Sequence, residues 1–479
     1  MNFLCLTPQF IVVATMILVL LLDAFAINNT AITIVTIVGL IASAKFGHEV
    51  LVLLHGQTVY VANNMLKIDS LGIVSNIVIL WLAMVIILAN VDYIKHMTKR
   101  VGEYYSIFMI AILGMMIMTS AVHVLMLYLG LETLSLALLG LIAFSQNSKS
   151  IEAAMKFFIL NAVASSILLL GVSFLYLATN GCLHLADISQ AIATNKINLQ
   201  ITALACLFIL VGVLFKVGLF PFHSWIPDVY QASPFNTVLL VSTISKIAAL
   251  LFAVRFIVSG LYSIMTVWQP IILTFAILSV GFGNIIALSQ TNIKRMLGYS
   301  AVANAGFIAI GIALGSTVSI GASMFYVLSY AISLIVALVV LMMLSNAEQD
   351  CEKLSDIQGL YKTNKILAFS LSLAMFSIAG IPPFVGFIAK LGIIQALMSN
   401  GWYIYTIALV LFSLIGAFYY LRVVKTIYFM EVSKESITSK PHKTSWIVHF
   451  TLTKLVFFML LISIWPHHII AIITKALAG

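Results

Sequence analysis

Residues 199–222 read LQITALACLFILVGVLFKVGLFPF, an apolar run of membrane-spanning length that closes with Lys216, Gly218 and Pro221. About 20 predominantly apolar residues in a helix cross the hydrocarbon core of a bilayer. Proline lacks the backbone N–H that a helix interior requires, so it interrupts the helix. The stretch therefore predicts a transmembrane helix that is broken near its end, with a lysine directly before the break.

A second interruption of the same kind lies further along the chain, where residues 380–384 read GIPPF. The two motifs lie five predicted helices apart, in helices 7 and 12, so two five-helix units, residues 101–260 and 261–430, would be inverted relative to each other. Paired Gly/Pro interruptions at matching positions point to the ion path of a transporter. The alternative interpretation is two ordinary proline kinks.

Composition places the whole chain in the membrane. Of 479 residues, 62% are hydrophobic and 8% are charged, against roughly 45–50% and about 25% in soluble domains. A large soluble protein is excluded. We expect an all-α polytopic protein of about 14 transmembrane helices, with broken helices 7 and 12. The apolar runs fall at 8–25, 29–44, 70–91, 103–120, 122–144, 152–179, 199–220, 236–258, 263–288, 293–313, 318–345, 364–397, 402–429 and 446–474.

The remaining regions are residues 1–100, with helices 1–3, and residues 431–479, with a loop and helix 14. Alternation from Val50 to Val61 suggests a short hairpin. The first ten residues have no basic segment of the kind that opens a signal peptide, so we expect residues 8–25 to stay as a helix. Most lysines and arginines fall in loops on one side, which predicts both termini on the outer, periplasmic side.

Several functions are excluded by missing motifs. The net charge of +9 comes from 24 lysines and arginines without a basic, aromatic-rich cluster, so no nucleic-acid partner is expected. The four cysteines form no CxxC pair, which argues against metal and iron–sulfur sites. No phosphate-binding loop or dinucleotide fingerprint occurs. We expect no cofactor and no soluble small-molecule substrate on this chain, and energy from an ion gradient or a partner subunit.

Charged residues within the predicted helices are the main functional candidates. A charge at the bilayer centre costs about 2.5–3.5 kcal/mol on insertion scales, so such residues usually mark ion or proton routes. Glu132, Lys216, Lys246 and Lys390 are the candidates for proton transfer. Glu132 and Lys216 are expected to act as a pair, because pairing stabilises the ammonium group and separation leaves it desolvated. Snorkelling competes as an explanation for Lys216 and Lys390, and a neutral, structural Glu132 is the alternative there.

Three other titratable residues are weaker candidates. His223 follows Pro221 at the first break, where an imidazole relays protons or merely caps the broken helix. Lys156 lies four residues after Glu152, a spacing that usually only stabilises a helix. Lys454 in the last helix has no partner motif and is expected to snorkel or to contact another subunit.

Residues 215–231, FKVGLFPFHSWIPDVYQ, resemble the signature of the antiporter-like membrane subunits of respiratory complex I and of multisubunit cation/proton antiporters. Residues 152–157 (EAAMKF), 245–248 (SKIA), 292–300 (NIKRMLGYS) and 379–383 (AGIPP) are similar to the same family, and the resemblance extends from about residue 100 to about residue 430. The ending from Pro227 to Gln231, and lysine at position 390, look like subunit N of the bacterial complex rather than subunit L or M.

The resemblance implies a function and a set of partners. The chain would be a proton-translocating subunit of NADH:quinone oxidoreductase in a bacterial inner membrane, although an organellar membrane stays open. It would lie in the lipid bilayer beside the other membrane subunits of complex I. FMN, iron–sulfur clusters and quinone would be bound by partner subunits, so no redox chemistry is expected on this chain. Protons would load Lys246 and leave through Lys390, with the Glu132–Lys216 pair setting the timing.

Two alternatives remain open. A subunit of a multisubunit sodium/proton antiporter would share the lysine-containing helices. A structural membrane subunit that pumps nothing is the other alternative. It stays open because the family usually has histidine where this chain has Asn304, and asparagine binds water but carries no proton.

Overall fold

The computed structural model describes residues 4–98, 100–194, 198–345, 350–431 and 444–478. The first half contains η1 (Leu4–Leu6), α1 (Thr7–Ala24), α2 (Asn29–Leu54), β1 (Val59–Val61), β2 (Leu66–Ile68), α3 (Ser70–Met97), α4 (Val101–Ser120), α5 (Val124–Ala143), α6 (Ser148–Ala178), α7 (Leu185–Ala193), α8 (Leu199–Val217), α9 (Trp225–Ala232), α10 (Phe235–Leu239), the π-helical η2 (Leu240–Ile244), α11 (Ser245–Ala253) and the π-helical η3 (Val254–Ser259).

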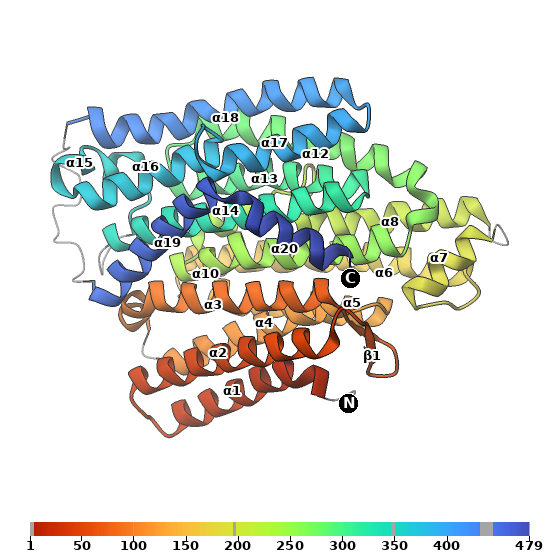
Figure 1. The fold of residues 1–479 in the computed structure, drawn as a ribbon. Coiled ribbons are helices and arrows are strands. Elements are labelled where there is room, and N and C mark those ends of the chain that lie inside the picture. The colour runs from red at the N-terminus through yellow and green to blue at the C-terminus, as the bar shows by residue number, and fades with distance from the viewer. Residues whose placement is uncertain (1–3, 99, 195–197, 346–349, 432–443, 479) are drawn as a thin grey trace.

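The second half contains η4 (Tyr262–Ile264), α12 (Met265–Ser289), α13 (Ile293–Leu314), α14 (Thr317–Leu344), η5 (Leu354–Ile357), α15 (Leu360–Thr363), α16 (Lys365–Ala379), α17 (Val385–Ser399), α18 (Tyr403–Phe429), α19 (Trp446–Ile464) and α20 (Pro466–Ala478). Among the described residues, 13 helices are long and apolar enough to cross a membrane. The shorter α16 and α17 follow one another across the bundle and supply a further crossing (Figure 1). The prediction of an all-helical protein with about 14 crossings is confirmed.

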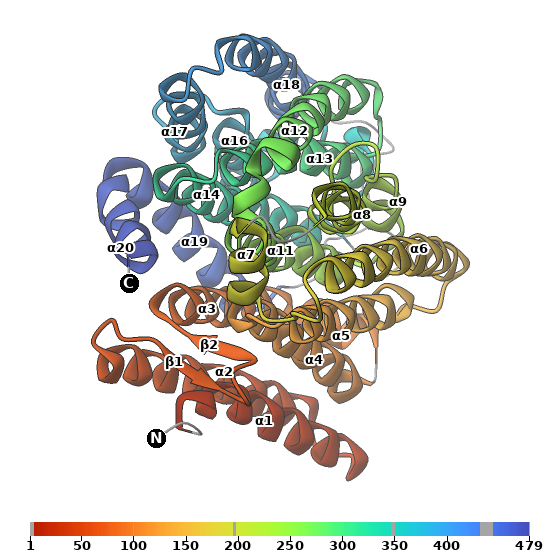
Figure 2. The ribbon, with the colours of Figure 1, turned by 90° about the vertical axis from the view of Figure 1, so that its right-hand side faces the viewer.

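Both termini lie at the same end of the bundle (Figures 1 and 2), as an even number of crossings requires. The β1–β2 hairpin and α7 lie at this end as well. The opposite end carries α15, the last residues of α18 and the first residues of α19 (Figure 1). The loop expected at 431–445 lies mostly outside the described residues. The inverted relation between residues 101–260 and 261–430 stays a prediction.

Polar side chains start many of the helices. An asparagine, aspartate or serine at the N-cap accepts a hydrogen bond from a backbone N–H in the first turn and so satisfies a donor that the helix leaves free. The residues that cap in this way are Asn28, Asp69, Asn147, Asn198, Asn292, Ser316 and Asn364. At these seven helices, a short polar residue between apolar runs marks where the helix begins.

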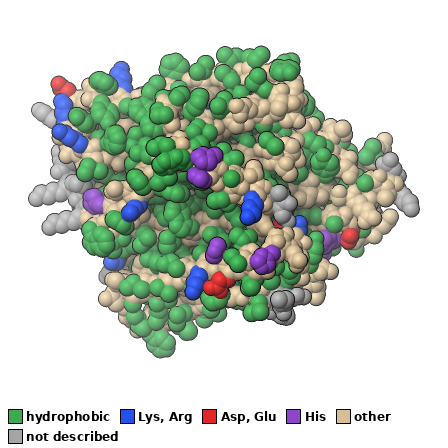
Figure 3. All heavy atoms as spheres, in the orientation of Figure 1, with side chains coloured by type: hydrophobic (Ala, Val, Ile, Leu, Met, Phe, Trp, Pro, Cys, Tyr) green, Lys and Arg blue, Asp and Glu red, His purple; other side chains and the backbone are tan. Residues whose placement is uncertain are grey.

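The centre of the bundle is formed by α13, α14 and the continuous segment from α10 to η3. These helices are almost entirely buried, whereas α1, α2, α18 and α19 expose large apolar side chains. Apolar side chains also cover much of the face shown in Figure 3, and the charged ones are few. Such a surface suits lipid or other membrane subunits. The buried centre is where the candidate charges gather.

Three local predictions were wrong. The hairpin pairs Val59–Val61 with Leu66–Ile68, and residues 50–54 belong to α2, because the apolar helix continues until His55 adopts a left-handed conformation. Helix α7 was not predicted, since nine residues between two apolar runs read as a loop. The run 446–474 is two helices, because Pro466 cannot donate to the preceding turn and disfavours helical Trp465.

Candidate functional site

The first break ends α8 at Val217. Gly218 follows with a φ of +87°, a left-handed conformation that glycine adopts without strain. The Lys246 ammonium group, which is 4% exposed, donates a hydrogen bond of 2.7 Å to the Val217 carbonyl oxygen. A Cβ atom at Gly218 would lie 2.9 Å from Lys246 Nζ and 2.2 Å from Ile226 Cδ1. The glycine thus ends the helix and leaves room for the lysine.

The second break has the same construction. Helix α16 ends at Ala379, and Gly380 follows with a φ of +82°. Lys390 of α17, 9% exposed, donates to the Ala379 carbonyl oxygen at 2.7 Å. A Cβ atom at Gly380 would lie 2.7 Å from Lys390 Cδ. Two buried lysines, far apart in the sequence, therefore cap the last carbonyl of two interrupted helices.

Lys216 and Glu132 lie near each other but form no direct ion pair, so the expected close pair is absent between these two described residues. Lys216 Nζ donates to Ser135 and, at 2.5 Å, to Asn161 Oδ1. The Glu132 carboxylate accepts a hydrogen bond from Ser165. Asn161 and Ser165 are one turn apart on α6, so side chains of this one helix bind both the lysine and the carboxylate.

Lys246 also lies beside an irregular stretch of helix. It is the second residue of α11, directly after the π-helical segment Leu240–Ile244. Single π-helical turns within α-helices are frequent at functional sites. All residues of the membrane-spanning part of this segment are buried. Snorkelling is therefore excluded for Lys246, whose ammonium group points to the first break.

Small cavities accompany the lysines. One, of about 30 Å³, is lined by Ser135, Lys216, Trp225 and Ser245, the residue before Lys246. A second, of about 10 Å³, is lined by Asn304, Tyr326, Tyr330 and Ala389, the residue before Lys390. A water molecule needs about 10–15 Å³ and some polar partners. The first cavity has room for water, and the second is at the lower limit for one molecule.

A neutral hydrogen-bonded cluster surrounds Asn304 in the centre of the bundle. The Tyr326 hydroxyl donates to Asn304 Oδ1 at 2.7 Å. Asn304 Nδ2 donates to the Ser300 carbonyl oxygen at 2.7 Å and lies 3.4 Å from the Tyr420 hydroxyl. Tyr330, also buried, has a hydroxyl without a hydrogen-bond partner. These tyrosines were not among the residues predicted from the sequence, although polar residues in otherwise apolar helices were the available signal.

Of the weaker candidates, His223 lies at the first break and Lys156 lies near the surface. His223 packs against Phe220 and Phe282 at ring-centroid distances of 5.6 and 5.7 Å, and its Nδ1 atom is buried without a hydrogen-bond partner. Lys156 is half exposed and forms ion pairs with Glu152 at 2.8 Å and Asp228 at 3.3 Å. Lys156 therefore belongs to a surface network, whereas His223 is at the first break.

Arg255 of η3 is buried. Its guanidinium group donates to both carboxylate oxygens of Asp69 at 2.7 and 2.6 Å, and its Nε donates to the Thr119 carbonyl oxygen. Burial alone would raise the pKa of Asp69, but the Arg255 charge and hydrogen bonds outweigh it and lower this pKa. The pair fastens η3 to the start of α3.

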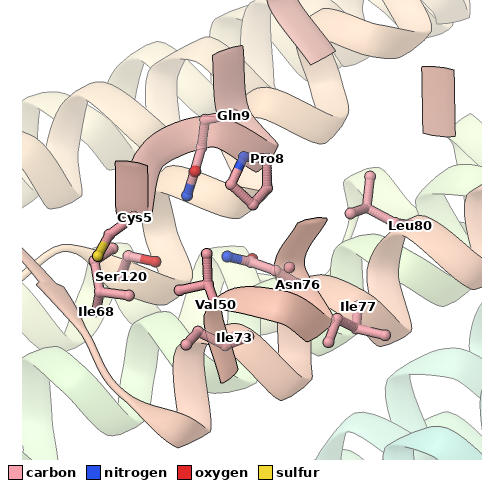
Figure 4. A pocket seen from close by; sticks show the side chains of 11 residues that line it. Cys5, Pro8, Gln9, Val50, Ile68, Ile73, Asn76, Ile77, Leu80 and Ser120 are labelled. Carbon is pink, nitrogen blue, oxygen red and sulfur yellow. The ribbon is translucent and has the colours of Figure 1, made fainter. Parts of the chain in front are cut away.

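One pocket among the N-terminal helices is unrelated to the lysines. It lies between α1, α2 and α3 and is lined mainly by apolar side chains, with Gln9, Asn76 and Ser120 as polar exceptions (Figure 4). None of its lining residues is charged. Across the part of the chain that the structure describes, no group of three or more His, Cys, Asp or Glu residues could hold a metal.

Comparison with known proteins adds to this geometry. The family described as NADH:quinone oxidoreductase/Mrp antiporter, TM, matches residues 121–416. NADH-quinone oxidoreductase subunit N from Thiobacillus denitrificans is 38% identical over 352 residues, 73% of this chain and 73% of the relative. A chain of respiratory complex I from Thermus thermophilus is 26% identical, with a TM-score of 0.81 over 97% of this chain and 98% of that chain. A chain of the Mrp complex from Dietzia sp. DQ12-45-1b shares the fold, with 17% identity and a TM-score of 0.86 over 100% of this chain and 97% of that chain.

Proposed function

This chain belongs to the NADH-quinone oxidoreductase subunit N family, and we propose that it carries protons through two buried lysine sites, Lys246 and Lys390. It is a membrane subunit of respiratory complex I, and other membrane subunits of that complex are its partners. The observation that carries the proposal is the matching position of the two lysines. Each is buried, and each donates to the last carbonyl of an interrupted helix at 2.7 Å.

The position of each lysine, buried and bonded to the last carbonyl of a helix, suits a group that gains and loses a proton. A protonated lysine donates to a carbonyl oxygen that the broken helix leaves without its usual partner. When the lysine releases its proton, the charge leaves a site of low dielectric, where an isolated ammonium group is costly. Both protonation states are therefore within reach at each break, as a relay requires.

Lys216 is proposed to control proton loading at Lys246. A positive charge in the cavity beside Ser245 disfavours a second one on Lys246, because charges interact strongly where water is scarce. Lys216 now binds Ser135 and Asn161, and Glu132 binds Ser165. Movement of Lys216 toward Glu132 would pair the two charges and allow Lys246 to take up a proton.

The neutral cluster around Asn304 is proposed to carry the proton from Lys246 toward Lys390. Asn304 does not titrate, so its role is to orient the Tyr326 hydroxyl and water. The cavity that Asn304, Tyr326 and Tyr330 share with Ala389 leads to the second lysine. A hydroxyl that donates one hydrogen while it accepts another passes a proton on without a lasting charge.

We propose that protons enter from the cytoplasm and leave on the periplasmic side of a bacterial inner membrane. Both termini would be periplasmic. The excess of lysine and arginine in the loops at the opposite end supports this orientation, since cytoplasmic loops are enriched in these residues. His223 at the first break is a further relay candidate, and Lys156 is the weakest.

The test is a Lys246→Met variant in the complete complex, reconstituted in vesicles. We expect NADH-driven proton pumping to fall at least about tenfold, since a positioned acid–base group contributes about 100-fold or more. Lys454→Met is the matched control, because Lys454 is an exposed lysine on α19 in contact with the Phe450 ring. Normal pumping by assembled Lys246→Met complex would contradict the proposal and favour a structural subunit.

The antiporter alternative predicts a different result. Sodium-dependent proton exchange by this chain without NADH would favour it, and so would purification with antiporter subunits instead of NADH:quinone reductase activity. The likeness to the Mrp chain is one of fold, whereas the relative with 38% identity is a complex I subunit.

A further inference from the structure

The last crossing is interrupted within the membrane. Helix α19 ends at Ile464 and α20 begins at Pro466, with Trp465 outside both helices. Pro466 provides no N–H for the last turn of α19. This break is at the surface, because Ile464 is 67% exposed and Trp465 is 50% exposed.

Contacts with α14 give the depth of the break. Ser333 Oγ lies 3.6 Å from Met459 Sδ of α19. At Gly321, an added Cβ would lie 3.7 Å from Ile473 and 3.4 Å from Leu477 of α20. The break falls between these two contacts, hence beside the middle of the 28-residue α14. A helix of this length exceeds the thickness of the hydrocarbon core, so its middle is at membrane mid-depth.

Two imidazoles lie at this depth on the outside of the chain. His467 and His468 follow the break directly, both are exposed, and their ring centroids are 4.1 Å apart. Histidine side chains are visible on the face that carries α19 and α20 (Figure 3). No described carboxylate lies within ion-pairing distance of either ring. Histidine is too short to reach the interface from here.

Lipid is a poor neighbour for this surface. Irregular backbone at membrane depth is tolerated only where protein or a water-filled cavity covers it. Ionisable side chains within the membrane face protein or water and are usually paired. The interruption at Trp465 and the two histidines point independently to a covered face.

We propose that the face formed by Trp465, His467 and His468 is the docking site for a transmembrane helix of a neighbouring complex I subunit, which presents a carboxylate at mid-depth. Charge complementarity selects the carboxylate. Imidazole N–H groups donate to it, and one acidic group shared by two adjacent rings satisfies both. This interface is separate from proton transfer at Lys246 and Lys390, so either proposal can fail alone.

The first test uses substitutions for which lipid and a carboxylate predict opposite effects. His467→Leu/His468→Leu favours contact with lipid and removes the donors. We expect the amount of intact complex on native gels to fall about threefold, in line with hydrogen bonds between membrane helices. His467→Gln/His468→Gln keeps donors and should restore most of it. His48→Leu, which removes an exposed histidine of α2, is the matched control.

A second measurement does not depend on stability. Benzoylphenylalanine in place of His468, in the otherwise native complex, should cross-link on illumination to another membrane subunit within a transmembrane segment that contains Asp or Glu. Adducts with lipid alone, or unchanged assembly of the double leucine variant, would overturn the proposed interface. A cross-link to a segment without a carboxylate would overturn the proposed partner chemistry.

Discussion

The two lysine sites at the helix breaks have the same kind of hydrogen bond, from the lysine to the last carbonyl of a helix, but they differ in their surroundings. A second lysine, Lys216, lines the cavity beside Ser245 at the first site, and α6 binds both this lysine and the carboxylate Glu132. At the second site, the cavity beside Ala389 is lined by the neutral cluster around Asn304. A charge that moves can change proton affinity by several kcal/mol in a dry site, and neutral dipoles change it less. The comparison suggests that the first site is switched and that the second accepts what the first releases.

The largest effect is expected when either lysine becomes arginine. Lys246→Arg and Lys390→Arg keep the positive charge and a donor for the helix carbonyl, but a guanidinium group does not release its proton in proteins. We expect each variant to lose proton pumping at least about tenfold. The measurement is the pH gradient formed by reconstituted complex at a matched rate of NADH oxidation.

If only one arginine variant retained proton pumping, the lysine at that position would act as a fixed charge. Only the other lysine would then exchange protons, and the two sites would differ in role. Pumping retained by both would contradict the relay altogether. Native gels of the same preparations supply the control for assembly.

The next effect concerns the neutral cluster. Asn304→Leu removes the acceptor of the Tyr326 hydroxyl and the donor to Ser300 and leaves buried groups unpaired. The loss of a buried hydrogen bond costs about 1–3 kcal/mol, so we expect proton pumping to fall about fivefold or more. Asn304→His restores hydrogen bonding and adds a titratable group, so pumping should match that of the native complex. Equal pumping by the leucine variant would exclude the cluster from the route.

The features that could be predicted from the sequence are those with a strong local signal. Apolar runs predicted the crossings, and Gly218 with Pro221 predicted the first interruption, because glycine and proline have few conformational alternatives. Lys246 and Lys390 were predicted as proton-transfer residues because a charge in an apolar run has few structural explanations, and this role stays a prediction. These features are local, so they are legible without knowledge of the packing.

The missing features depend on which helices meet. Nothing in the sequence shows that Ser165 of α6 binds Glu132 and that Asn161 binds Lys216, because hydrogen-bond partners on three helices cannot be paired from spacing alone. The same holds for Tyr326 and Asn304, and for Arg255, whose partner Asp69 is 186 residues away. Pro466 indicates a helix break, but the run 446–474 was interpreted as one helix because it is long and apolar.

A moderate effect is expected at the charge pair that distinguishes the first site. Glu132→Gln keeps a group that accepts from Ser165 but removes the negative charge. Lys216 then has no carboxylate to approach, and we expect proton pumping to fall about threefold, as for a loss of about 0.6 kcal/mol. Ser165→Ala, which leaves the charge in place, is the matched control and should change pumping less. A normal rate of proton pumping in Glu132→Gln would contradict the proposal that Glu132 and Lys216 control proton loading at Lys246.

The smallest effect on pumping is expected at the Arg255–Asp69 pair, which contacts neither lysine. Asp69→Asn leaves a buried, uncompensated guanidinium group and should destabilise the chain by about 3–5 kcal/mol. The Arg255 charge and hydrogen bonds lower the pKa of Asp69 in the folded chain. The ion pair therefore stabilises the fold fully at pH values above the ordinary carboxyl pKa, about 4. This stabilisation is lost as the pH falls through the lowered pKa of the folded chain. Thermal unfolding of the native complex should therefore shift to lower temperature on acidification, whereas Asp69→Asn should lack this part of the shift. The assembled Asp69→Asn complex could instead pump protons as poorly as the lysine variants. The proton route would then not be confined to the two breaks, and the different surroundings of Lys246 and Lys390 would not explain different roles.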